Sequence, residues 1–363
     1  MILALQYVRG IAAMMVVYHH TGFQVVKATG DAPLPLWELG AAGVDLFFVV
    51  SGFIMWVTTH STEVGPGQFL CRRVIRVAPL YWLVTLVLLA VSLVIPQLLS
   101  TTRFNPYHAG ISMLFVPVEH PILADQVLPF FIQGWTLNYE MFFYAIFALA
   151  MLLGPALRVR AILGALAFLA FAGLVVQFEN PQAKFYTSTI LLEFAFGVAI
   201  AVLYTRRIAM NALGAVMAVV VGLIALAVAG AAGFAYGASG VDPARTLVWG
   251  CPAAAIVYGM VMLDRERGVS RYESLLRLGD SSYSLYLTHI FTLPVVAIAW
   301  RLSGLSFAGF SLVGYAVLAM SASAVAGWLT YVAVERPLTN MLRDMVRFDG
   351  TIERPAMSRR RRA

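Results

Sequence analysis

The sequence predicts an all-α protein, a polytopic integral membrane bundle of about ten transmembrane helices, and three observations carry that prediction. Hydrophobic residues make up 61% of the chain and charged residues 12%, with a mean hydropathy of +0.82. Soluble domains carry about a quarter charged residues. Apolar windows long enough to cross a hydrocarbon core of ~30 Å recur along the chain, and basic residues gather in alternate connections. No stretch is left for a separate soluble catalytic domain, so any chemistry is expected within the bundle.

Ten apolar windows are the expected membrane-crossing helices, read as runs of about 20 residues. The fifth and sixth windows are the shortest. The windows are 4–25, 41–59, 77–96, 135–154, 161–177, 189–204, 211–234, 245–263, 281–300 and 311–333.

The distribution of basic residues predicts the orientation. With a cytoplasmic N-terminus, the inner connections and the tail hold nineteen Lys and Arg, whereas the outer connections hold five. The positive-inside rule therefore places both termini on the cytoplasmic side of the membrane. Residues 1–340 are expected to form one transmembrane domain and residues 341–363 a disordered basic tail near anionic lipid headgroups. The net charge of +7 is then a membrane feature, and no nucleic acid partner is expected.

The outer connection at 97–134 is the longest, and its apolar run at 111–116 is too short to cross a bilayer. We expect a helix there that lies against the outer mouth of the bundle, since long loops are commonly functional. Cys71 and Cys251 give no disulfide framework, and the six histidines lack zinc-type spacing, so no metal is expected.

The first window contains Arg9 and His20, although an ionisable group in mid-membrane costs about 2.5 to 3.5 kcal/mol. Their spacing nearly closes three helical turns, so they share one face and lie roughly 16 Å apart along the axis. We expect both to border one hydrated passage, in which His20 acts as a catalytic group. The alternative is a packed histidine bonded to a backbone carbonyl. His19 points about 100° away, and whether it shares the role of His20 stays open.

Three further ionisable groups lie at depths where a site is possible. Asp45 and Glu140 are expected in the outer half, near the level of His20, where each either orients a catalytic histidine or forms hydrogen bonds between helices. His289 lies roughly 13 Å into its span and shares a face with Tyr286, as part of a site or as a packed pair.

Arg72, Arg73 and Arg76 precede the third window on its predicted cytoplasmic side. They either set orientation against lipid headgroups or form an anion site, because guanidinium groups bind phosphate through two hydrogen bonds. Glu335, before Pro337, is expected at the end of the last span, paired with a nearby cation.

Taken together, several motifs resemble the acyltransferase-3 family of integral-membrane O-acyltransferases, and the opening is most similar to exopolysaccharide acetyltransferases. The first matching motif is an arginine followed by a histidine in the first span. The matches, in chain order, are Arg9 with His20, Gly43 to Phe53, Arg72 to Pro79, Trp135 to Glu140, Ser284 to His289, and Glu335 to Pro337.

The resemblance implies transfer of an acyl group, expected to be acetyl, from acetyl-CoA to a hydroxyl of a cell-surface or exopolysaccharide sugar. The acceptor is then a carbohydrate or a lipid-linked glycan, and the other partners are membrane lipids and polysaccharide-assembly proteins. A neutral His20 would remove a hydroxyl proton or take the acyl group transiently. The implied catalytic residues are His20, Arg9, Glu140, Asp45 and His289, and the implied coenzyme A ligands are Arg72, Arg73 and Arg76.

Two other function classes stay open at this level. Buried ionisable groups are also typical of a transporter or flippase that moves a glycan or lipid-linked intermediate through a proton relay. We find no internal repeat of the kind that many transporters carry. A scaffold subunit of a polysaccharide assembly would tolerate changes at Arg9 or His20.

Overall fold

The computed structural model describes residues 2–31, 34–62, 64–99, 101–123, 126–176, 178–208, 210–234 and 242–346. Within these ranges the regular structure is helical, apart from one isolated antiparallel bridge between Glu119 and Val127. A helix satisfies its backbone hydrogen bonds within its own segment, as an apolar environment requires. The predicted all-α membrane bundle is confirmed.

A long helix occupies each of the ten predicted windows. Eight helical stretches of the described residues are long and apolar enough to cross a membrane. Helices α1 and α5 fall outside that set, because polar side chains such as Arg9 and His20 lower the hydropathy of α1, and α5 has 16 residues. The long helices are α1 (Leu3–Thr29), α2 (Ala42–Thr59), α3 (Pro66–Val94), α5 (Trp135–Ala150), α6 (Pro155–Val175), α8 (Leu191–Thr205), α9 (Ala212–Ala231), α11 (Cys251–Arg267), α13 (Ser282–Leu302) and α14 (Gly309–Thr330).

Shorter helical segments connect or extend these helices. Two of them, η4 and η5, are π-helical turns. The short segments are η1 (Pro35–Ala41), η2 (Pro96–Leu98), α4 (Pro106–Met113), η3 (Ile132–Gly134), α7 (Pro181–Tyr186), α10 (Pro243–Arg245), η4 (Thr246–Gly250), α12 (Glu273–Asp280), η5 (Tyr331–Glu335) and α15 (Arg336–Met345).

The end of the chain departs from the predicted boundary at residue 340. Helix α14 continues through η5 into α15, which ends at Met345, so residues 341–345 are helical and do not begin a disordered tail. The polar positions of α15 had obscured this extension of an apolar helix. The rest of the predicted tail, 347–363, lies outside the described residues.

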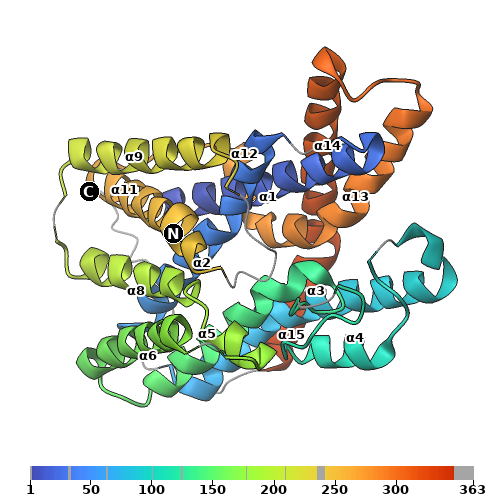
Figure 1. The fold of residues 1–363 in the computed structure, drawn as a ribbon. Coiled ribbons are helices and arrows are strands. Elements are labelled where there is room, and N and C mark those ends of the chain that lie inside the picture. The colour runs from blue at the N-terminus through green and yellow to red at the C-terminus, as the bar shows by residue number, and fades with distance from the viewer. Residues whose placement is uncertain are drawn as a thin grey trace, which may run out of the picture.

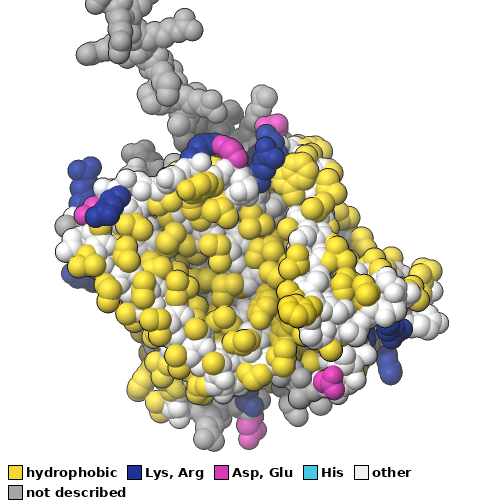
Figure 2. Space-filling model, turned by 90° about the horizontal axis from the view of Figure 1, so that it is seen from above, with side chains coloured by type: hydrophobic (Ala, Val, Ile, Leu, Met, Phe, Trp, Pro, Cys, Tyr) yellow, Lys and Arg dark blue, Asp and Glu magenta, His cyan; other side chains and the backbone are white. Residues whose placement is uncertain are grey.

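The surface matches a protein surrounded by lipid. Figure 2 shows a face on which hydrophobic side chains cover the middle, while charged side chains gather at its rim. Large apolar side chains such as Leu213 on α9 and Phe310 on α14 are among the most exposed in the chain. In water such exposure would be costly, whereas lipid is a suitable environment for it.

Small residues allow the helices of the bundle to approach closely. Helix α2 packs along α8, α9 along α11, and α13 along α14 (Figure 1). At the contact of α2 with α8, a Cβ added to Gly52 would lie 2.2 Å from the Phe194 carbonyl oxygen, and one added to Gly197 would lie 2.0 Å from that of Val49. Close backbone approach through glycine is a common packing mode in membranes.

Gly52→Ala is therefore expected to destabilise the bundle by about 1 to 3 kcal/mol, since a backbone oxygen cannot yield to the added methyl. Thermal unfolding of the detergent-purified variant should shift to lower temperature. Gly164→Ala on α6 is the matched control, because nothing lies within 4 Å of its added Cβ. Equal melting temperatures for the two variants would contradict this account of the α2–α8 contact.

The long connection at 97–134 folds over α3. Helix α4 ends at Met113, inside the apolar run where a helix was predicted, and Phe115 turns the backbone at φ 60°. Trp82 donates a hydrogen bond of 2.8 Å to the Met113 carbonyl. His108 and His120 are buried beside each other, with ring centroids 5.4 Å apart. Nδ1 of His120 accepts hydrogen bonds from the backbone N–H groups of Ile122 and Leu123, at 3.2 and 3.1 Å.

Burial lowers the pKa of His120 from its ordinary value of 6.5, and the neighbouring His108 lowers that pKa further. A depressed pKa means that the unfolded chain binds the extra proton first, so stability is lost as the pH falls below about 6.5. His120→Asn keeps an acceptor and does not titrate. Its melting temperature should change less between pH 7.5 and 5.5 than that of the unchanged protein, and parallel curves would contradict a role for His120.

Candidate active site

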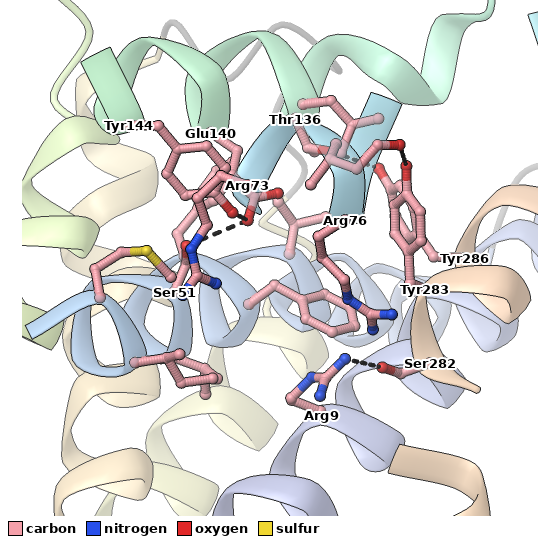
Figure 3. A pocket seen from close by; sticks show the side chains of 18 residues that line it. Arg9, Ser51, Arg73, Arg76, Thr136, Glu140, Tyr144, Ser282, Tyr283 and Tyr286 are labelled. Atoms are coloured by element: carbon pink, nitrogen blue, oxygen red, sulfur yellow. Dashed lines mark hydrogen bonds between the residues drawn. The ribbon is translucent and has the colours of Figure 1, made fainter. Parts of the chain in front are cut away.

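A cavity of about 210 Å³ lies where α1, α2, α3, α5 and α13 meet. Its wall combines apolar side chains with charged and hydroxyl groups. Figure 3 shows the guanidinium groups of Arg9 and Arg76 pointing into the space between α1 and α13. The labelled lining residues in Figure 3 are Arg9, Ser51, Arg73, Arg76, Thr136, Glu140, Tyr144, Ser282, Tyr283 and Tyr286.

Arg9 is positioned by contacts on both sides. Its guanidinium donates hydrogen bonds of 3.0 Å to Gln6 on the preceding turn and of 3.0 Å to the Ser282 hydroxyl on α13. The second bond joins the first predicted span to the ninth. Neither partner is charged, so the positive charge of Arg9 remains available to an anionic group in the cavity.

The three arginines Arg72, Arg73 and Arg76 of α3 have different surroundings in the structure. Arg76 forms an ion pair with the buried Glu335, whose second carboxylate oxygen accepts a 2.5 Å hydrogen bond from Ser284. Arg73 lies over the Phe69 ring, and its Nε is buried without a partner. Arg72 is exposed and does not line the cavity. The structure therefore brings Arg73 and Arg76 to the cavity, and the Glu335 pairing predicted from sequence is made with Arg76.

Glu140 enters the cavity from α5. Its carboxylate accepts hydrogen bonds from the Tyr144 hydroxyl and from the Ser51 hydroxyl, the latter at 3.3 Å. Two hydroxyl donors can hold a carboxylate in one orientation. Glu140 thus faces the arginines across the cavity and does not contact His20.

His20 and His289 lie against each other, with ring centroids 4.8 Å apart. Nδ1 of His20 is 2.9 Å from the Val16 carbonyl, and Nδ1 of His289 is 3.2 Å from the Leu285 carbonyl. A carbonyl can only accept, so each Nδ1 carries a proton, and in the neutral form of each ring Nε2 keeps its lone pair. Nε2 of His289 is buried without a partner. The pair therefore presents two unprotonated nitrogens suited to base or nucleophile chemistry.

This cavity is not the single passage bordered by both Arg9 and His20 that the sequence predicts. Arg9 lines the cavity, whereas neither His20 nor His289 does. Tyr286 does line it, and its ring centroid lies 6.1 Å from that of His289. The Tyr286 hydroxyl is 2.9 Å from the Thr136 hydroxyl and donates to the Gln133 carbonyl at 2.8 Å. Tyr286 thus forms part of the cavity wall, is fixed there by hydrogen bonds, and lies next to the histidine pair.

Asp45 pairs with Arg245 and not with a histidine. Its two oxygens receive Nε and a terminal nitrogen of Arg245, at 3.1 and 2.7 Å, and both side chains are buried. Nδ1 of His20 is bonded to Val16, so the expectation that Asp45 or Glu140 orients His20 is corrected. Nδ1 of His19 lies 3.1 Å from the Trp37 carbonyl of η1, and the centroid of its ring lies 5.3 Å from that of His20.

Two buried charged residues were missed by sequence reasoning. Arg245 had been assigned to an outer connection, yet it is buried at the start of the helix that continues into α11. Glu193 on α8 is also fully buried and lies near Asp45 and Arg245. An ionisable residue inside an apolar window is itself a signal of a polar cluster, and Glu193 carried that signal.

The fold and site define a multi-pass membrane protein whose polar chemistry lies inside its helical bundle. The chain belongs to the acyltransferase-3 family, since the family model described as an acyltransferase domain matches residues 2–332. It is therefore a membrane O-acyltransferase, and the transporter and scaffold alternatives are set aside.

Two relatives are similar over most of their length. The exopolysaccharide production protein ExoZ of Rhizobium meliloti (strain 1021) is 37% identical over 323 residues, which cover 87% of this chain and 93% of ExoZ. The acyltransferase MdmB of Streptomyces mycarofaciens is 29% identical over 374 residues, which cover 92% of this chain and 90% of MdmB. No solved structure matches the chain.

The buried pair of Asp45 and Arg245 predicts an asymmetric response to substitution. Asp45→Asn removes the carboxylate bonded to the buried Arg245 guanidinium, with Glu193 close by but not bonded to it, and should cost about 3 to 5 kcal/mol, seen as lost folded protein in size-exclusion chromatography. The triple variant Asp45→Leu/Arg245→Met/Glu193→Gln removes all three charges and should restore the folded yield. A triple variant as poorly folded as the single one would contradict a pairing role.

Proposed function

We propose that this protein transfers an acetyl group from acetyl-CoA to a hydroxyl of an exopolysaccharide sugar or of its lipid-linked precursor, in a bacterial inner membrane. The observation that carries the proposal is the placement of an arginine-lined cavity near a pair of histidines whose Nδ1 protons are bonded to backbone carbonyls. The name of ExoZ, an exopolysaccharide production protein, supports the acceptor class.

The donor is assigned to the arginine side of the site. Arg73 and Arg76 border the cavity at the start of α3, the end of the bundle that the charge distribution assigns to the cytoplasm. Guanidinium groups bind phosphates well, so the diphosphate of coenzyme A would lie at Arg73 and its pantetheine arm would enter the cavity. Arg9, with only neutral partners, would then face the thioester.

The acyl transfer assigned to His20 balances without a metal or redox partner. Nε2 of His20 takes the proton of the sugar hydroxyl, and the hydroxyl oxygen bonds to the thioester carbonyl carbon. The carbon–sulfur bond breaks, and the thiolate receives the proton back from the imidazolium. His289, packed against His20, would hold the ring in place and contact the reacting groups through its free Nε2.

The proposed reaction includes a movement of Tyr286. The histidine pair does not line the cavity, and Tyr286 lies both in the cavity wall and near His289, so we expect its ring to turn aside when the thioester reaches His20. That motion breaks the contacts of its hydroxyl with Thr136 and Gln133. Two neutral hydrogen bonds contribute roughly 1 to 3 kcal/mol in total, which a bound donor can offset.

His20→Gln is expected to reduce acetylation at least 100-fold, because a positioned base contributes about 10² to 10⁴ in rate. The measurement is alkali-labile label on glycan after membranes are incubated with labelled acetyl-CoA. His60→Gln is the matched control, since His60 caps the far end of α2, is bonded to the Val57 carbonyl and lies outside the cavity lining.

Both variants should be compared at equal membrane abundance. Full labelling with His20→Gln would reject His20 as the reacting group. Absence of label in membranes with the unchanged protein, under conditions where its surface glycan is modified in cells, would reject acetyl-CoA as the donor.

A further inference from the structure

Helix α15 brings a further arginine to the start of α3. The helix packs along α3 (Figure 1), and the Arg76–Glu335 ion pair fixes the point where it begins. Glu335, Thr339 and Arg343 follow one another at intervals of four residues and so share one face of the helix. Glu335 and Thr339 are buried, whereas Arg343 is exposed. The shared face therefore leaves the packed contact with α3 at Arg343.

Arg343 joins a group of positive charges of which Arg76 alone is ion-paired in the described residues. Its electrostatic neighbours are the three arginines of α3. In the described part of the chain, Arg72, Arg73 and Arg343 form no ion pair, since the carboxylate of Glu335 is taken by Arg76. Nε of Arg73 is buried with no partner at all. Unpaired like charges repel one another, so this arrangement is stabilised when an anion lies between them.

The positions along the helices separate two phosphate sites. Arg73 lines the cavity, so a phosphate bound there is close to the cavity mouth. Arg343 lies eight residues, about 12 Å, beyond Glu335, whereas Arg73 lies three residues, about 4.5 Å, before Arg76, the partner of Glu335. A ligand with one phosphate group near its reactive arm and another at its far end would contact both arginines.

We propose that α15 completes the donor site, with Arg343 binding the 3′-phosphate of a nucleoside 3′-phosphate 5′-diphosphate while Arg72 and Arg73 bind its diphosphate. The proposal rests on the proposed acyl-CoA donor and adds a residue and a phosphate to it. The C-terminal helix is then a binding element for the nucleotide, in addition to packing on α3.

Calorimetric binding of coenzyme A and of 3′-dephospho-coenzyme A to the purified protein tests the assignment. Arg343→Gln should raise the Kd for coenzyme A about tenfold, the loss of one charge-assisted contact, and leave the Kd for the dephospho form unchanged. Arg73→Gln should weaken both ligands. Arg271→Gln, an exposed arginine already paired with Glu273, is the control and should weaken neither.

The outcomes separate this proposal from the donor assignment. If Arg73→Gln weakens coenzyme A and Arg343→Gln does not, the role of α15 is overturned and the donor stands. If Arg343→Gln weakens both ligands equally, the assignment to the 3′-phosphate is overturned. If the unchanged protein binds neither ligand, the donor proposal fails, and this one fails with it.

Discussion

The ion pair between Arg76 and Glu335 is the contact on which the rest of the site depends. A charge inside a membrane bundle is costly unless it is paired or faces a wet cavity, and this pair joins α3 to the end of the last long helix. Glu335 also accepts a hydrogen bond from Ser284 of α13, two residues from the Ser282 that holds Arg9. Three helices are thereby fixed around one carboxylate, and the shape of the cavity follows.

Helix α13 connects the two halves of the site. Ser282, Tyr286 and His289 follow one another along it, so one helix contacts Arg9, closes the cavity and packs against His20. In the proposed reaction, donor binding and proton transfer occupy separate compartments until the tyrosine moves. Such a separation keeps water and unwanted hydroxyls from a bound thioester, a protection that transferases need because hydrolysis competes with transfer.

The positions of the long helices could be predicted from the local sequence, because the length and hydropathy of a span are properties of a continuous stretch. The ionisable residues of α1, α3, α5 and α13 were found for the same reason, as charges standing inside or beside apolar windows. The partner of each charge could not be predicted from a continuous stretch of sequence. Asp45 meets Arg245 across 200 residues, Val16 takes the place of an orienting carboxylate, and His20 and His289 lie outside the wall of the cavity that Arg9 lines. These outcomes depend on how helices pack, which spacing along one helix does not encode.

The π-helical turn η5 absorbs one extra residue at the point where α14 continues into α15. A π turn holds about one residue more than an α turn, and such turns occur as single bulges inside α-helices. Loss of one residue within 331–334 would convert the bulge into an ordinary α turn and leave Glu335 on the face that meets α3. The same deletion in the regular helix α14 would rotate α15 by about 100° and carry Glu335 away from Arg76.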